Sequence, residues 1–266
     1  MPPEILDDGG FFRALRNQMN VLGALILRDI HTRYGRRNLG FLWLFIEPAM
    51  LGLFVATIRV LKDRSLPGGM NIVAFAVVGY VVYFLFRSTV GRAANAAEQN
   101  EPLLWHARVT LEDIVLSRAI LDTAAVLVAT GVFLVGIGLI YGLWPEDWIQ
   151  IAAGVVLMGL LAHGVALIVL SLTRFGQSIV ERILHPILYI SIIFTGVFYM
   201  VWWLPKPFQD LVLLLPLVHI FEFVREGQFG PIVPYHYDIG YVLLWTLILN
   251  VYGGFALRAA KPHLEL

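Results

Sequence analysis

The chain has 266 residues, of which 59% are hydrophobic and 14% are charged, and its formal net charge is zero. Soluble proteins carry about 25% charged residues, so this composition indicates a polytopic membrane protein, and the balanced charge implies no nucleic-acid partner. The absence of cysteine excludes disulfides and cysteine-ligated metals. Residues 1–10 lack the basic region and apolar core of a cleavable signal peptide, so we expect none.

The first predicted element is an amphipathic helix over residues 11–31. Its apolar residues recur at helical spacing, and its arginines and asparagines fall mostly elsewhere. A helix with a basic face and an apolar face lies in the membrane interface. Packing of this helix on other parts of the protein is the alternative.

Long apolar runs predict six membrane-spanning helices in an all-α fold. Most of these runs exceed the roughly 18 residues that a spanning helix needs. They cover residues 39–61, 71–91, 119–143, 149–173, 183–204 and 239–257. The whole chain, 1–266, is expected to form one transmembrane domain.

Residues 205–238 interrupt this series before the last span. The apolar stretch from Leu211 to Phe221 is too short to cross a hydrocarbon core of about 30 Å, and Pro216 breaks it. We therefore predict an extracytoplasmic region of re-entrant helices there.

The distribution of basic residues predicts the orientation. With both termini in the cytoplasm, fourteen lysines and arginines lie inside and five outside, as the positive-inside bias requires. A seventh span at 208–224 would send Arg258 and Lys261 outside, which this bias disfavours.

The segment RDIHTRYGRRNLGFLWLFIEP, residues 28–48, gathers arginines before the first span and places a carboxylate inside it. Arg33, Arg36 and Arg37 would face anionic headgroups, each contributing about 1 kcal/mol of attraction. Glu47 lies roughly 12 Å into the span at 1.5 Å per residue. Such a carboxylate should face protein or a polar cavity, and Pro48 should kink the helix.

Enzyme signatures are missing from the sequence. It contains no HExxH, no GxSxG and no phosphate-binding loop, so any ATP must bind to another subunit. His163, alone in an apolar span, is expected to be a hydrogen-bonded packing residue. Arg118 and Asp122 are spaced i, i+4 and are expected to neutralise each other, with a proton relay as the alternative.

Residues 28–48 resemble the approach to the first span of ABC-2 type exporter permeases, specifically the capsular polysaccharide export branch. Asn38 departs from that pattern in a minor way. Residues 100–118, NEPLLWHARVTLEDIVLSR, form a second and looser match. The chain length, the six-span layout and the broken element before the last span extend the resemblance over nearly the whole chain.

The resemblance implies an inner-membrane subunit of a bacterial exporter. It implies a homodimer, with two copies of a separate ATPase that bind ATP and magnesium, and no cofactor on this chain. The implied cargo is a lipid-linked acidic polysaccharide, which leaves through a periplasmic polysaccharide co-polymerase and an outer-membrane export channel.

The resemblance also assigns a cytoplasmic coupling helix to residues 93–105. The expected contacts with the ATPase come from Glu98, Gln99, Asn100, Glu101, Leu103 and Leu104. Independently, the alanines favour a short helix that Pro102 ends, and Thr110 with Asp113 resembles a capping box for the next helix.

The expected substrate contacts combine arginines with aromatic residues. Arg33, Arg36 and Arg37 suit a lipid phosphate or acidic sugar, and Glu47 lines the same polar path. Aromatic rings suit the apolar faces of sugars, and the candidates are Tyr34, Trp43, Phe45, Phe198, Tyr199, Trp202 and Trp203. An aromatic belt at the membrane interface is the alternative for these rings.

Three other functions stay open at this point. One is an ABC-2 permease for O-antigen, teichoic acid or a drug. The others are a secondary transporter, which should show inverted repeats, and a membrane enzyme acting on lipid-linked sugars, which should show polar catalytic residues on its spans.

Overall fold

A computed structural model describes residues 8–34, 45–47, 49, 50, 54, 57, 66–104 and 109–260. This part of the chain is helical and contains no β-strand. Its longer helices are α1 (Asp8–Tyr34), α3 (Ile72–Gly91), α5 (Leu111–Tyr141), α6 (Trp148–Leu172), α7 (Gln177–Ser191), α9 (Pro216–Phe229) and α10 (Ile239–Ala260). The short ones are η1 (Pro67–Gly69), η2 (Glu98–Asn100), α4 (Glu101–Leu104), η3 (Thr173–Phe175), η4 (Val201–Trp203) and α8 (Lys206–Val212). The predicted all-α fold is confirmed.

Helix α6 is the centre of the bundle, because α3, α5, α9 and α10 all pack against it. Three glycines on α6 permit this close packing. A Cβ atom at Gly154 would collide with Val224 of α9, and one at Gly164 would collide with the backbone of α10. At Gly159 the added atom would meet Thr123 of α5. Small residues at these positions let helix backbones approach closely, as is common between membrane helices.

Four helices in the described part of the chain are long and apolar enough to cross a membrane. They are α3, α5, α10, and α6 continued through η3 to Phe175. Helices α8 and α9 pass the same test only as a pair, bent by 103°, which is the geometry of a broken span or of a re-entrant loop. The predicted first span, 39–61, lies largely outside the described residues, so the count of six spans stays a prediction.

The predicted span at 183–204 is wrong as a single helix. Helix α7 has 15 residues, contains Pro186 and ends at Ser191, and a turn follows it. Gly196 in this turn adopts φ 86°, a conformation that favours glycine. The backbone carbonyls of Gly196 and Val197 accept hydrogen bonds from Arg225 of α9. An arginine from another helix thus satisfies carbonyls that a continuous helix would have satisfied itself.

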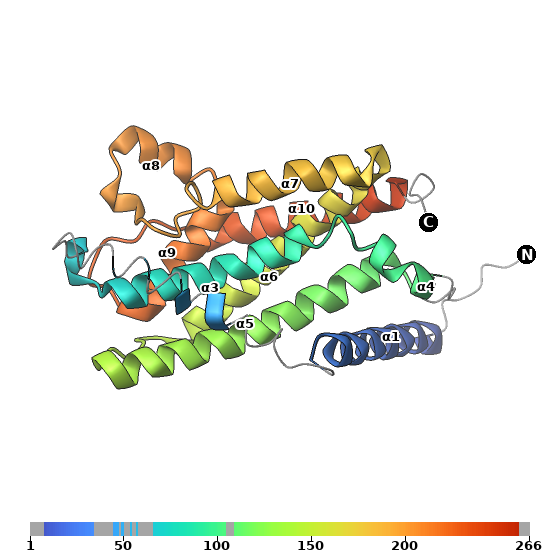
Figure 1. The fold of residues 1–266 in the computed structure, drawn as a ribbon, viewed down its shortest axis with the longest axis horizontal. Coiled ribbons are helices and arrows are strands. Elements are labelled where there is room, and N and C mark those ends of the chain that lie inside the picture. Colours follow the sequence, from blue (N-terminus) through green and yellow to red (C-terminus); the bar gives the residue numbers. More distant parts are fainter. Residues whose placement is uncertain are drawn as a thin grey trace, which may run out of the picture.

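Helix α1 lies beside the first half of α5 (Figure 1). Leu25 and Asp29 are buried, and the Asp29 carboxylate lies 3.6 Å from Arg118 Nε. Other apolar residues of α1, including Phe12 and Met19, are exposed. One face of the predicted amphipathic helix therefore packs on protein, and apolar residues are exposed on the rest of it.

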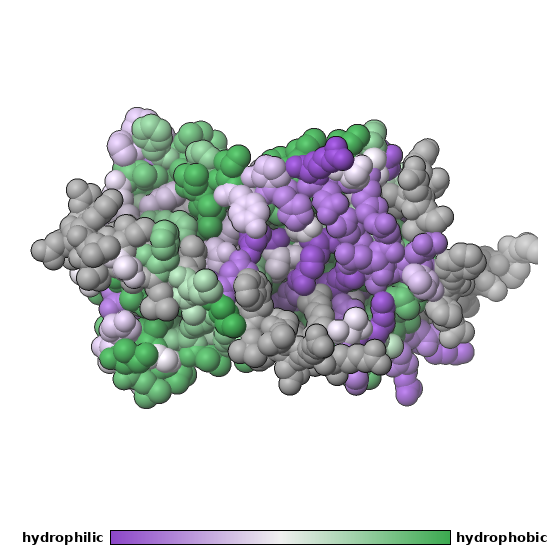
Figure 2. Space-filling model, in the orientation of Figure 1, coloured by the Kyte–Doolittle hydropathy of each residue, from purple (hydrophilic) through white to green (hydrophobic). Residues whose placement is uncertain are grey.

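The two ends of the bundle differ in character. Helix α4, the start of α5 and the end of α10 lie at one end, and α8 lies at the other (Figure 1). Figure 2 shows hydrophilic residues gathered over the half that carries α4, and mostly hydrophobic residues over the half that carries α8. We call these the coupling end and the far end.

Candidate substrate pathway and coupling segment

A polar cluster joins Glu47 to α3 inside the apolar bundle. The Glu47 carboxylate forms an ion pair with Arg87, and their side chains are 23% and 18% exposed. The Tyr80 hydroxyl donates to Glu47 Oε1 at 2.7 Å. Tyr80 and Arg87 are seven residues apart, two helical turns, so α3 presents both on one face. The expectation that Glu47 faces protein instead of lipid is met by these two partners.

Arg87 also connects α3 to α7. Its Nη1 donates to the Tyr189 hydroxyl at 3.2 Å, and its guanidinium lies 5.4 Å from the centre of the Tyr189 ring. Beside this contact, the Tyr83 hydroxyl donates to the carbonyl of Leu188. Three segments therefore meet at one arginine.

A small pocket opens next to this cluster, with a volume of about 210 Å³. Its lining residues are Arg87, Ser88, Gly91, Arg92, His185, Leu188 and Tyr189. Arg92 is 40% exposed, and its Nη2 lies 2.5 Å from Asp122 Oδ2. The pocket thus offers cationic and hydroxyl groups. Each of its two arginines is paired with a carboxylate, Arg87 with Glu47 and Arg92 with Asp122. We call these residues, together with Glu47 and Tyr80, the Arg87 cluster.

Arg118 and Asp122 do not behave as the sequence suggested. Arg118 lies against Asp29 of α1 at 3.6 Å, and Asp122 lies against Arg92. The charges on α5 are therefore neutralised by neighbouring helices, where the sequence predicted a pair along one helix. His163 behaves as predicted, because its Nδ1 lies 2.6 Å from Asn250 Oδ1 of α10.

The predicted substrate residues fall into three groups: those outside the described residues, those next to Glu47, and the aromatic residues from position 198 to 203. Arg36, Arg37, Trp43 and the side chains of Arg33 and Tyr34 lie outside the described residues. Phe45, beside Glu47, packs on Phe133 of α5 with ring centres 6.0 Å apart. Their roles in binding stay predictions.

The remaining aromatic candidates lie toward the far end and are not brought together with Glu47. Trp203 stacks on Phe75 with ring centres 5.4 Å apart, and Trp202 packs in the same cluster. The Tyr199 hydroxyl donates to the carbonyl of Phe194 at 2.7 Å, and Phe198 packs against the main core. Phe75 and Arg87 are twelve residues apart on α3, about 18 Å along the helix.

The coupling segment differs from the single helix that was predicted for residues 93–105. Turns over residues 92–97 lead into η2 and then α4. Pro102 lies in the first turn of α4, where a missing N–H is tolerated, so it does not end a helix as expected. The predicted capping box is confirmed, since Thr110 and Asp113 exchange both hydrogen bonds at the start of α5.

The expected ATPase contacts differ in accessibility. Glu98, Gln99 and Glu101 are exposed, and Leu103 and Leu104 are half-buried. Asn100 is buried; it donates to the carbonyl of Ala96 at 2.8 Å and accepts from Arg28 at 3.0 Å. The buried Asn100 side chain therefore links the coupling segment to α1.

A second set of hydrogen bonds fixes this segment to α7. Gln177 Nε2 donates to Asn95 Oδ1 at 2.9 Å and to Glu98 Oε2 at 2.6 Å. Asn95 Nδ2 in turn donates to Glu181 Oε1 at 2.9 Å. Hydrogen bonds between side chains thus bind the first turns of α7 to the coupling segment.

Sequence reasoning missed Tyr80, His185 and Tyr189, and it counted Arg87 and Arg92 only among the fourteen basic residues expected inside. The one available signal was an arginine within the apolar run of α3. A cation there needs a partner, and Glu47 was the acidic residue in the neighbouring predicted span.

Four candidate membrane spans with a polar cluster between helices fit a membrane transport protein. Residues 20–229 match the family model described as ABC-2 type transporter. The chain is 33% identical over 246 residues to the capsule polysaccharide export inner-membrane protein CtrC of Neisseria meningitidis serogroup B, covering 91% of this chain and 92% of the relative.

Two further relatives show similar coverage. The capsule polysaccharide export inner-membrane protein BexB of Haemophilus influenzae is 30% identical, over 93% of both chains. The polysialic acid transport protein KpsM of Escherichia coli is 29% identical, over 91% of this chain and 94% of its own. The chain belongs to the ABC-2 type transporter family and is a transport permease, with ATP hydrolysis on a separate subunit.

Proposed function

We propose that this chain is the inner-membrane permease of a capsular polysaccharide exporter and that its cargo is acidic and lipid-linked. The observation that carries the proposal is the similarity, over at least 91% of the chain, to relatives named for capsule polysaccharide export or polysialic acid transport. The expected assembly is a homodimer with two ATPase subunits at the coupling end, both termini in the cytoplasm, and a periplasmic co-polymerase and outer-membrane channel beyond.

The Arg87 cluster suits an acidic cargo because it can exchange partners. Arg87 is neutralised by Glu47, and Arg92 by Asp122. A carboxylate or phosphate that enters the pocket takes over one guanidinium through charge-assisted hydrogen bonds. The displaced Glu47 keeps its bond from Tyr80, so its charge is still partly compensated.

The pocket is small for a polymer. Ligand pockets usually measure about 300–1,000 Å³, whereas this one measures about 210 Å³. It has room for one acidic group at a time, and the Tyr189 ring beside it offers a surface on which a sugar can slide. Passage of a long chain then consists of repeated short contacts and not of one tight complex.

The test begins with purification of the full chain in a mild detergent and identification of its stoichiometric partners. An ATPase in equal amount supports the proposal, and reproducible recovery of the folded chain alone contradicts it. The complex is then reconstituted, and its ATP hydrolysis is compared with lipid-linked acidic polysaccharide and with a neutral lipid-linked glycan. The acidic cargo is expected to stimulate ATP hydrolysis, and Arg92→Gln is expected to reduce that stimulation. Equal stimulation by the neutral glycan would contradict an acidic cargo.

A further inference from the structure

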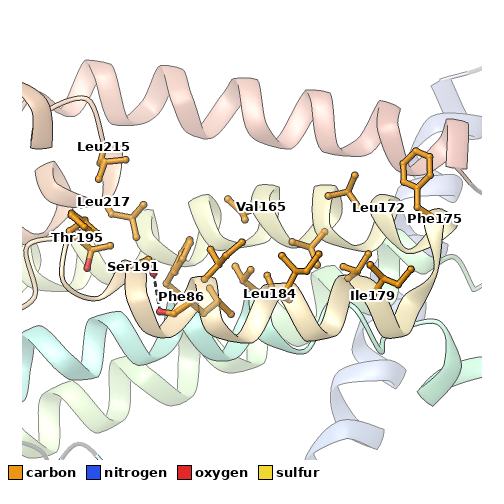
Figure 3. Close-up of a pocket in the computed structure, with 17 residues that line it drawn as sticks. Phe86, Val165, Leu172, Phe175, Ile179, Leu184, Ser191, Thr195, Leu215 and Leu217 are labelled. Carbon is orange, nitrogen blue, oxygen red and sulfur yellow. Dashed lines mark hydrogen bonds between the residues drawn. The ribbon is translucent and has the colours of Figure 1, made fainter.

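A long apolar groove runs along α7, and Leu188 lies between it and the pocket of the Arg87 cluster. The volume of the groove is about 710 Å³, and helices α3, α6 and α7 contribute most of its lining (Figure 3). Ile179, Ile183 and Ile187 of α7 line it together with Val165 and Leu172 of α6. We call it the α7 groove.

The lining of the α7 groove offers no free polar group. Only Ser191 and Thr195 among its residues carry hydroxyls. The Ser191 hydroxyl donates to the carbonyl of Leu188 at 2.9 Å, and that of Thr195 donates to the carbonyl of Ile192 at 3.2 Å. The three isoleucines are each more than half exposed. An occupant must therefore be apolar along the whole length of the groove.

A cation lies at the coupling end of the groove. Phe175 lines this end, and the Arg174 guanidinium lies 4.5 Å from the centre of its ring. Arg174 is exposed, and within the part of the chain that the structure describes no carboxylate forms an ion pair with it. An anionic group can reach this arginine without displacing another residue.

Helix α7 is longer than the apolar half of one membrane leaflet. It has 15 residues, or about 22 Å at 1.5 Å per residue. Half of a hydrocarbon core of about 30 Å is about 15 Å. An acyl chain that starts near Phe175 therefore ends within the groove, before Leu215 and Leu217 close its far end.

We propose that the α7 groove binds a phospholipid, with one acyl chain along Ile179, Ile183 and Ile187 and its phosphate at Arg174. The apolar lining selects a hydrocarbon chain, and the exposed arginine at the mouth selects an anionic head. The lipid packs along the same helix whose Tyr189 contacts Arg87. This inference holds for any cargo.

The test uses the full chain in nanodiscs and phosphatidylglycerol with a diazirine at the end of one acyl chain. After illumination, mass spectrometry maps the labelled residues. Val128 and Val132, which are exposed on α5, report ordinary contact with lipid. Labelling of the α6 and α7 residues in the groove is expected to be well above the labelling of these two valines. Equal labelling of both faces would show ordinary lipid contact and would overturn the proposal.

Arg174→Gln tests the headgroup contact. Loss of about 1 kcal/mol of attraction corresponds to about a fivefold fall in groove labelling, with labelling of Val128 and Val132 unchanged. Arg258→Gln is the matched control, since Arg258 is an exposed arginine at the same end that pairs with Glu112. Equal effects of the two substitutions would contradict a site at Arg174. Ile183→Trp, which fills the groove, is expected to lower labelling while the chain elutes as before.

A second copy of the chain is the competing occupant. Because the sequence contains no cysteine, Ile183→Cys introduces a single thiol. No disulfide-linked dimer is expected under mild oxidation. Efficient crosslinking of two copies through this residue would assign the groove to a subunit interface and overturn the lipid site.

Discussion

Tyr80 and Arg87, two turns apart on α3, both bind the Oε1 atom of Glu47. Charge and hydrogen bonding therefore converge on a single oxygen within the apolar bundle. Removal of either charge leaves the other half-buried with a hydroxyl group as its remaining partner, Tyr80 for Glu47 and Tyr189 for Arg87. Such loss costs about 3–5 kcal/mol in buried pairs, whereas removal of both charges is often nearly neutral.

Glu47→Gln and Arg87→Gln are each expected to destabilise the fold, and the double variant is expected to be more stable than the sum of the two effects predicts. The measurement is a double-mutant cycle on unfolding in mixed micelles. A coupling energy of at least about 1 kcal/mol is expected for contacting residues. Additive effects would show that the ion pair contributes nothing to stability.

Glu98→Lys combined with Glu101→Lys is expected to reduce recovery of the ATPase with the permease. Both residues are exposed in the coupling segment, and the substitutions reverse its charge. The measurement is the ratio of the two subunits after affinity purification. Asp210→Lys, an exposed reversal on α8 at the far end, is the control. An unchanged ratio in the double variant would mean that the ATPase docks elsewhere.

Gln177→Ala is expected to weaken the link between the coupling segment and α7 without loss of the ATPase. Its amide donates to both Asn95 and Glu98, so the substitution removes two hydrogen bonds. Substitutions between coupled sites typically change the coupling by about 0.5–2 kcal/mol. The measurement is cargo exported per ATP hydrolysed, with Ser178→Ala on the next, exposed position as control. A normal ratio with normal assembly would exclude a coupling role for this contact.

Arg225→Met is expected to destabilise the turn that follows α7. Arg225 is buried, lies 3.7 Å from the centre of the Phe75 ring, and donates to the carbonyls of Gly196, Val197 and Tyr199. Each unsatisfied buried carbonyl costs about 1–3 kcal/mol. Limited proteolysis of residues 196–204 reports the change.

Arg225→Lys separates charge from geometry at the same position. Lysine keeps the positive charge but lacks the planar fork that reaches several carbonyls at once. Partial protection from proteolysis, between the original chain and Arg225→Met, is therefore expected. Full protection would mean that charge alone holds the turn.

Local signals in the sequence predicted much of the helical layout. Helix α6 begins at Trp148 and α10 at Ile239, each within one residue of the predicted positions. Both follow a clear change from polar to apolar residues. The capping box of Thr110 and Asp113 was also predictable, because both partners lie within one helical turn.

Features that depend on distant residues were not predictable. The end of α7 at Ser191 requires Arg225, which lies 34 positions later in the sequence. The Arg87 cluster requires three separate segments to meet, and periodicity within each segment carries no information on that meeting. Arg118 and Asp122 had a suitable spacing for a mutual pair, but tertiary packing supplied each with another partner.

A single residue, Gly176 with φ 119°, separates α7 from η3, which continues α6. Side chains rarely tolerate this conformation, so α7 does not continue the axis of α6. Its first turns are instead bound to the segment between α3 and α5 through Gln177 and Glu181. A displacement of that segment is therefore expected to reach α7 through these side chains, and through α7 the contact between Tyr189 and Arg87.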